Sequence, residues 1–196
     1  MKDESPSAWR EVWAMLRAIV IAVIIALLVR QFVVETYQVD GISMEPTLQN
    51  GERLLVNKFI YRFETPHVGQ IIVFHPPIPG ITVDYVKRVI ALPGQTFYSK
   101  DGQIFINGKL LAEPWEPASW LGDFTGSEFL KQPNDDCPYS GPVDPNPITI
   151  PTGYVFVLGD HRAVSYDSRC FGIVPMASIR GQVMLVWWPF ADFRTL

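Results

Sequence analysis

The sequence predicts a mainly β protein: an antiparallel, barrel-like catalytic domain with an N-terminal transmembrane helix and a loop-rich insert. An uninterrupted apolar run occupies residues 18–29. After it, short runs rich in β-branched and aromatic residues alternate with Pro, Gly, Asn and Asp, a pattern typical of strands joined by turns. Between residues 113 and 151 these runs give way to a segment rich in Pro, Gly and Asp, which predicts the insert.

The apolar run predicts a transmembrane anchor at residues 17–36. The charge-free part alone is shorter than the roughly 20 residues that a spanning helix needs. Arg17 and Arg30 lie near its ends, where their long side chains can extend to the lipid headgroups. A cleaved signal peptide or a buried helix is the alternative, but the run is not followed by the small-x-small site of a cleaved leader.

The flanking charges predict the orientation of this anchor. Lys2, Arg10 and Arg17 precede the run, whereas Arg30 alone closely follows it. Because Lys and Arg concentrate on the cytoplasmic side, we expect residues 1–16 to be cytoplasmic. Residues 37–196 would then form one domain on the exported side, a size consistent with a single core.

Six apolar runs after the anchor predict strands. The clearest hairpin is expected around KDGQIFINGKLL (100–111), where Asp101-Gly102 and Asn107-Gly108 are both turn dipeptides that tolerate positive φ. The runs are ERLLVNKFIY (52–61), QIIVFHP (70–76), DYVKRVIAL (84–92), QIFINGKLL (103–111), GYVFVLGD (153–160) and GQVMLVWW (181–188).

Composition excludes several functions. The net charge is -4 and the chain has no block of basic residues, so we predict no nucleic-acid partner. The only two cysteines, Cys137 and Cys170, are too far apart for a CxxC metal motif, and we predict no metal and no cofactor. In an oxidising compartment these cysteines could instead form a disulfide that fastens the insert.

Two residues are candidates for catalysis. Ser43 follows a glycine-containing turn, where serine usually serves only local hydrogen bonding. Lys87 lies in a strand-like run, and strict alternation would place Tyr85, Lys87 and Val89 on one face. If that face is buried, desolvation lowers the lysine pKa, and the neutral amine can take a proton from a serine hydroxyl. If it is solvated, Lys87 is an ordinary edge-strand lysine.

Histidine offers a rival base. His67 and His75 lie beside prolines, with no pattern that links them to Ser43. His161 follows Asp160 in a polar segment, residues 159–172, and a Ser-His-Asp triad built on His161 stays open because triads are recognised by geometry.

Taken together and in this order, these segments resemble the type I signal peptidases, peptidase family S26. The chain carries SMEPTL at 43–48, GERLLVNK at 51–58, YVKRVIALPG at 85–94 and GDHRAVSYDSRCFG at 159–172. The resemblance implies a serine endopeptidase with Ser43 as nucleophile and Lys87 as general base. It also implies that Ser165 orients the lysine amine and that Asp167 and Arg169 form a buried pair. The small side chains of the substrate would be held by Tyr37, Val39, Leu48, Tyr85 and Val86.

Some residues depart from the family pattern. Glu52 stands where Asp is frequent, and His161 and Val164 depart from the last motif at turn-supporting positions. Gly41 replaces a hydroxyl residue that some members use for the oxyanion, so backbone N–H groups, including that of Ser43, would hold it. Lys87 stands where the eukaryotic secretory branch has His, which indicates a bacterial or organellar enzyme.

The resemblance implies that the partners are exported preproteins, cleaved after small-x-small sites, and membrane lipid. The expected location is a bacterial or organellar membrane, such as that of the thylakoid. Two alternatives remain. A self-cleaving repressor shares the Ser-Lys chemistry but carries a DNA-binding region in place of an apolar span. A non-enzymatic module could bind a partner through the apolar residues 186–190, which in a signal peptidase would instead touch lipid.

Overall fold

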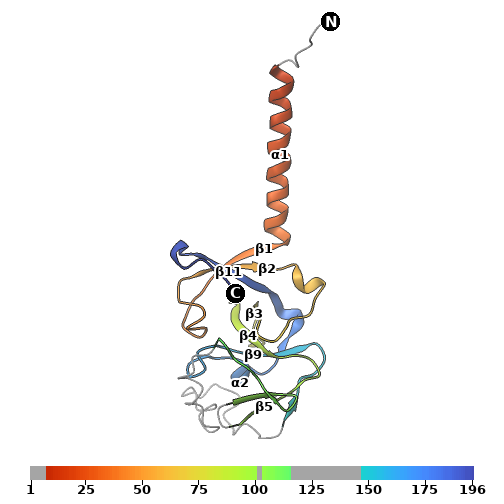
Figure 1. Cartoon of the computed structure of the whole chain (residues 1–196). Coiled ribbons are helices and arrows are strands. Elements are labelled where there is room, and N and C mark those ends of the chain that lie inside the picture. Colours follow the sequence, from red (N-terminus) through yellow and green to blue (C-terminus); the bar gives the residue numbers. More distant parts are fainter. Residues whose placement is uncertain (1–7, 101–102, 116–146) are drawn as a thin grey trace.

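The computed structural model describes residues 8–100, 103–115 and 147–196. A long helix, α1 (Ala8–Phe32), stands out from a β domain (Figure 1). The strands are β1 (Val34–Gln38), β2 (Arg53–Asn57), β3 (Ile71–Phe74), β4 (Tyr85–Ala91), β5 (Thr96–Lys100), β6 (Gln103–Ile106), β7 (Lys109–Leu110), β8 (Ile148–Thr149), β9 (Tyr154–Leu158), β10 (Val174–Pro175), β11 (Ile179–Trp188) and β12 (Arg194–Thr195). The short helices are η1 (Ile60–Arg62), α2 (Ser168–Phe171), η2 (Met176–Ser178) and η3 (Phe190–Asp192).

Helix α1 is long and apolar enough to cross a membrane between Trp9 and Leu28, and none of that stretch is buried against the rest of the protein. The helix begins before the predicted anchor of residues 17–36 and ends before it does. Residues 34–36 belong to β1, because this segment, with the β-branched Val34 and Thr36, pairs with β2. The apolar character is continuous across this boundary, so hydropathy alone could not locate it.

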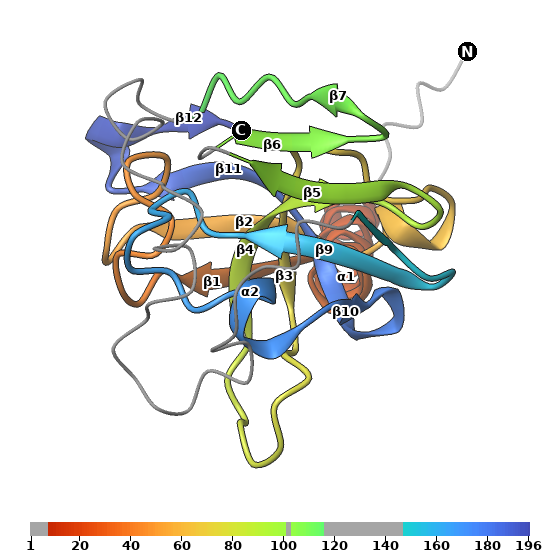
Figure 2. The ribbon, with the colours of Figure 1, turned by 90° about the horizontal axis from the view of Figure 1, so that it is seen from below.

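The described strands form two antiparallel sheets. The larger is eight-stranded, in the order β1-β2-β11-β3-β4-β9-β10 with β12 beside β11, and the smaller has the order β7-β6-β5-β8. Viewed along α1, the smaller sheet lies to one side of the larger, whose long strand β11 is bent (Figure 2). The prediction of a mainly antiparallel β fold with an N-terminal apolar helix is confirmed.

All six predicted runs carry strands, and five further described strands were missed: β1, β5 and the two-residue strands β8, β10 and β12. The predicted hairpin joins β6 to β7 through Asn107 and Gly108, both at positive φ. Strand β1 was assigned to the anchor, and β5 (TFYSK) has too little apolar alternation to be recognised from sequence. The other predicted turn, residues 101–102, and the core of the predicted insert, residues 116–146, lie outside the described residues.

Three apolar clusters hold the sheets. One fills the space beneath β1, β2, β11 and the turn that follows β1, and includes Met44 and Leu48. A second joins β4 and β9 to the smaller sheet, with the rings of Phe97 and Phe156 stacked 4.2 Å apart. The third packs the opposite faces of β3, β4 and β9 against β10. Strand β4 therefore contributes to two clusters and is held rigidly, and this strand carries Lys87.

Candidate active site

Ser43 lies on a compact turn between β1 and β2. The turn is held at its start by Gly41, at φ +101°, whose N–H donates to the side chain of Asn50 over 2.9 Å. It is held from below by Met44 and Leu48, both fully buried, with a 2.9 Å hydrogen bond from the Leu48 N–H to the Met44 carbonyl. Ser43 itself is half-buried. The core thus fixes the turn while the hydroxyl stays accessible.

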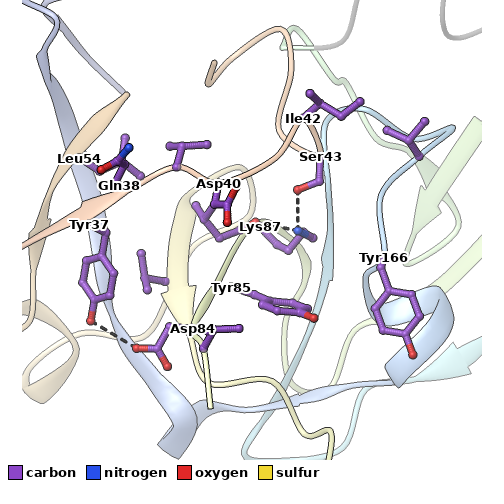
Figure 3. Close-up of a pocket in the computed structure, with 15 residues that line it drawn as sticks. Tyr37, Gln38, Asp40, Ile42, Ser43, Leu54, Asp84, Tyr85, Lys87 and Tyr166 are labelled. Atoms are coloured by element: carbon purple, nitrogen blue, oxygen red, sulfur yellow. Dashed lines mark hydrogen bonds between the residues drawn. The ribbon is translucent and has the colours of Figure 1, made fainter. Parts of the chain in front are cut away.

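Lys87 meets Ser43 directly. Its Nζ donates to Ser43 Oγ over 2.8 Å and to the Val86 carbonyl over 3.0 Å (Figure 3). The side chain is 4% exposed, and Val89 on the same face is fully buried. Lys87 is therefore a buried lysine and not the solvated edge-strand lysine of the alternative interpretation.

Burial changes the protonation of Lys87. Desolvation disfavours the ammonium and lowers the pKa from 10.5 to about 8, although the negative charge of Asp167 opposes the shift. Arg169 lowers the pKa a little further and Asp160 raises it. Near neutral pH a fraction of the lysine is therefore a free amine within hydrogen-bond distance of a serine hydroxyl, an arrangement that can generate a nucleophile.

Asp167 and Arg169 shape the loop beside this pair. The Arg169 guanidinium donates two hydrogen bonds of 2.7 Å to the Asp167 carboxylate, and the Gly159 N–H donates a third of 3.0 Å. Burial opposes ionisation of Asp167, but the charge and hydrogen bonds of Arg169, together with hydrogen bonds from Gly159 and Ser165, outweigh it and hold the pKa of that carboxyl below its usual value. Both residues are buried, so the geometry expected from the sequence is present.

Ser165 lies on the same loop and is fully buried. It packs so closely against Gly159 that any Cβ at position 159 would overlap Ser165 Oγ and the Ser43 carbonyl oxygen. Gly159 therefore permits the close approach of the loop to the Ser43 turn. The role expected for Ser165, orienting the Lys87 amine, stays a prediction.

His161 contacts Ser43 through its backbone. Its N–H donates to the Ser43 carbonyl over 3.1 Å, and its own carbonyl accepts from the Ser165 N–H over 3.0 Å. The base candidate within hydrogen-bond distance of the Ser43 hydroxyl is Lys87. His161 instead links the nucleophile turn to the loop.

Sequence reasoning missed a second buried ion pair. Arg88 donates to both oxygens of Asp160, over 2.8 and 2.6 Å, and also to Thr47 Oγ1 over 3.2 Å. Its guanidinium lies 4.5 Å from the centre of the Trp115 ring. Arg88 thus joins the turn of Ser43, the strand of Lys87 and the loop of Ser165. The available sequence signal was that Arg88 directly follows Lys87 and therefore lies on the opposite face of the same strand.

A cleft of about 500 Å³ opens beside the Ser43–Lys87 pair (Figure 3). Four of the five residues expected to hold substrate line it: Tyr37, Val39, Tyr85 and Val86. Leu48 is not among the lining residues, and its side chain is fully buried in the core below Ser43. The other lining residues are Gln38, Asp40, Ile42, Ser43, Leu54, Val73, Val83, Asp84, Lys87, Val164 and Tyr166.

The remaining features of the site are Cys170 and the possibility of a metal ion. Cys170 is buried and disulfide-bonded, and Cys137, the partner expected from the sequence, lies outside the described residues. Within residues 8–100, 103–115 and 147–196, His, Cys, Asp and Glu form no group of three that could hold a metal ion.

Comparison with known proteins gives consistent matches. The family model described as signal peptidase, peptidase S26, matches residues 12–188. Signal peptidase IB of Staphylococcus aureus strain COL is 36% identical over 190 residues, which cover 94% of each chain. A probable signal peptidase I-1 of Synechocystis is 36% identical over 197 residues, covering 97% of this chain and 90% of its own. The crystal structure of a signal peptidase I from Enterococcus faecalis V583 is 33% identical and covers 62% of this chain and 98% of its own, with a TM-score of 0.45.

Proposed function

Because the chain belongs to the signal peptidase family, peptidase S26, we propose that it cleaves signal peptides from exported preproteins with Ser43 as nucleophile and Lys87 as general base. The observation that carries the proposal is the 2.8 Å contact between Ser43 Oγ and the Nζ of a buried lysine. A lysine of ordinary pKa would be almost entirely protonated at neutral pH and unable to accept the proton.

The reaction follows from this geometry. The neutral Lys87 amine takes the proton of Ser43 Oγ, and the oxygen attacks the substrate carbonyl to form a tetrahedral intermediate. Its oxyanion is held by backbone N–H groups, including that of Ser43. Lys87 then gives its proton to the leaving amine, which leaves an acyl-enzyme. The same amine activates a water that hydrolyses the ester and restores Ser43.

The cleft suits an extended peptide. On one wall β1 lies at the edge of the described sheet, so its outer backbone groups are available to a partner strand. The other wall is formed by β4. Strand β9 pairs with β4 only from Arg88 onward, so this pairing does not include Tyr85 and Val86. A peptide placed between these backbones could form β-type hydrogen bonds on both sides. The apolar lining would select small side chains, as at small-x-small sites.

The membrane helix supports the choice of substrate. We propose that residues 1–16 are cytoplasmic and that the β domain lies on the exported side, since Lys and Arg are more frequent before the apolar run. Strand β1 follows α1 almost directly and also lines the cleft. A preprotein held in the same membrane by its own apolar core would therefore reach the cleft already positioned.

Cleavage of a model preprotein in liposomes tests the proposal. Wild type should cut after a small-x-small site, and Ser43→Ala and Lys87→Ala should each lose at least about 1,000-fold in kcat/KM, since residues that act as a unit cause large losses. Ser99→Ala and Lys100→Ala, on β5, are matched controls that should retain activity. Circular dichroism checks that all variants are folded. If Lys87→Ala keeps its activity, the base lies elsewhere and His161 is the next candidate.

A further inference from the structure

A polar cluster outside the proposed catalytic pair fastens the turn that carries Ser43, residues 39–52. Arg194 of β12 donates two hydrogen bonds to the Glu52 carboxylate, of 2.7 Å to Oε1 and 2.8 Å to Oε2. Its Nη2 also donates to the Thr47 carbonyl over 2.6 Å. Glu52 lies at the end of the turn and Thr47 lies within it, so one guanidinium joins two points of the same turn.

Glu52 is a buried carboxylate that depends on this partner. The residue is 2% exposed. Besides Arg194, its side chain accepts a hydrogen bond from the Gln49 N–H over 3.0 Å, and its backbone carbonyl accepts from the Val39 N–H over 2.8 Å at the base of the turn. A buried carboxylate that has lost its cationic partner is costly. Without Arg194, the turn would therefore have to move to let water reach the Glu52 charge and the Thr47 carbonyl.

The sheet determines where Arg194 lies. Strand β12 pairs with β11, with Arg194 opposite Val186, and β11 pairs with β2, with Val186 opposite Leu54. Figure 2 shows β12, β11 and β2 following one another in this order. The Arg194 side chain thus spans the width of β11 to reach Glu52, which immediately precedes β2.

Thr47 connects this cluster to the proposed catalytic pair. Its hydroxyl accepts a hydrogen bond from Arg88 over 3.2 Å, while its carbonyl accepts from Arg194. Arg88 directly follows Lys87 on β4, and Thr47 lies four residues after Ser43. Two guanidiniums, from strands that are not neighbours in the sheet, therefore hold the turn at one residue. A shift of this turn changes the 2.8 Å distance between Ser43 Oγ and Lys87 Nζ, and a misplacement of about 1 Å can cost about 100-fold in rate.

We infer that Arg194 is a positioning residue for the nucleophile Ser43. Through Glu52 and Thr47 it holds the turn so that the serine hydroxyl stays within hydrogen-bond distance of the lysine amine. Arg194 does not line the cleft, so its removal should slow the chemical step more than it weakens substrate binding. This inference rests on the proposed function, in which Ser43 attacks the substrate.

The test measures kcat and KM separately for a peptide substrate, with the full-length enzyme in detergent and Ser43→Ala as the blank. Arg194→Gln should lower kcat at least about tenfold and change KM less than about threefold, because a displaced nucleophile slows the chemical step. Glu52→Gln keeps an acceptor oxygen and leaves Arg194 on the Thr47 carbonyl, so it should lose less. Arg62→Gln is the matched control, because Arg62 is exposed, belongs to η1 and does not line the cleft.

The double variant Glu52→Gln/Arg194→Gln shows whether the two residues act as a unit. It should lose no more kcat than Arg194→Gln alone, whereas independent residues would multiply their losses, and multiplied losses would overturn the inference. The double variant also leaves no unpaired charge buried, so it replaces Arg194→Gln in the test if that variant does not fold. Its kcat should be at least about tenfold below that of wild type.

Circular dichroism and urea unfolding give the folded fraction of each variant, so that kcat is expressed per folded enzyme. A loss of activity that a lower folded fraction explains entirely would indicate a merely structural role and would overturn the inference. A wild-type kcat in the Arg194 variants, or a loss confined to KM, would overturn it too and would leave the proposed function standing while wild type cuts. Failure of wild type to cut any peptide would remove both.

Discussion

The buried Lys87 predicts how activity depends on pH. A general base must be neutral to act, so kcat/KM should rise as pH increases through the lysine pKa of about 8. The neutral fraction is then roughly one-tenth at pH 7, one-half at pH 8 and nine-tenths at pH 9. At the ordinary pKa of 10.5 only about one lysine in 3,000 would be neutral at pH 7, so burial raises the reactive fraction about 300-fold.

The assay is kcat/KM for a peptide substrate in detergent between pH 6 and pH 10, at constant ionic strength. We expect a tenfold rise per pH unit below about pH 7, a midpoint near 8 and a plateau above about 9. Ser43→Ala supplies the blank for uncatalysed hydrolysis, and near-ultraviolet circular dichroism at each pH excludes unfolding. A midpoint near 6.5, the usual pKa of histidine, would refute the assignment of Lys87 and favour His161.

Two further predictions concern stability and the loop. Lys87→Met removes the cost of a buried lysine, about 3 kcal/mol at pH 7, but loses the hydrogen bonds to Ser43 and Val86 at roughly 1 kcal/mol each. The variant should therefore be about 1 kcal/mol more stable than wild type at pH 7. The folded pKa lies below the unfolded one, so wild-type stability rises between pH 8 and 10.5. Urea unfolding should therefore show the difference moving by about 2 kcal/mol toward wild type between pH 7 and 10, which makes the variant about 1 kcal/mol less stable than wild type at pH 10. A pH-independent difference would argue against a shifted lysine. Gly159→Ala should lower kcat/KM at least about tenfold, because the added methyl overlaps Ser165 and the Ser43 carbonyl, and full activity would contradict that packing.

Some features were predictable because they depend on local chemistry. The apolar helix follows from hydropathy, and the β6–β7 hairpin follows from the Asn107-Gly108 dipeptide. The approximate strand positions follow from β-branched runs between turn residues. The predicted end of the apolar helix lay too far along the chain because β1 is itself partly apolar, and only its pairing with β2 distinguishes strand from helix there.

The candidate site also has features that the sequence predicted and features that it could not. Motif order singled out Ser43, Lys87 and the Asp167–Arg169 pair, but two segments 44 positions apart can be joined in many ways, and sequence could not give their 2.8 Å contact. The family resemblance also assigned Leu48 to the substrate pocket; in the structure its side chain is buried in the core and does not line the cleft, and its role in binding stays a prediction. Sequence alone does not distinguish an apolar side chain that lines a cleft from one that packs into the core beneath it.

The sequence by itself determined which residue types are available, the helix that can cross a membrane and the order of the segments that carry polar chemistry. The tertiary structure alone decided that Lys87 is buried, that Arg88 and Asp160 join three segments and that Tyr37 and Asp84 meet across the cleft. The physical reason is that desolvation and hydrogen bonding depend on which side chains surround a group. Those neighbours come from strands far apart along the chain and are brought together only by the pairing of the sheet.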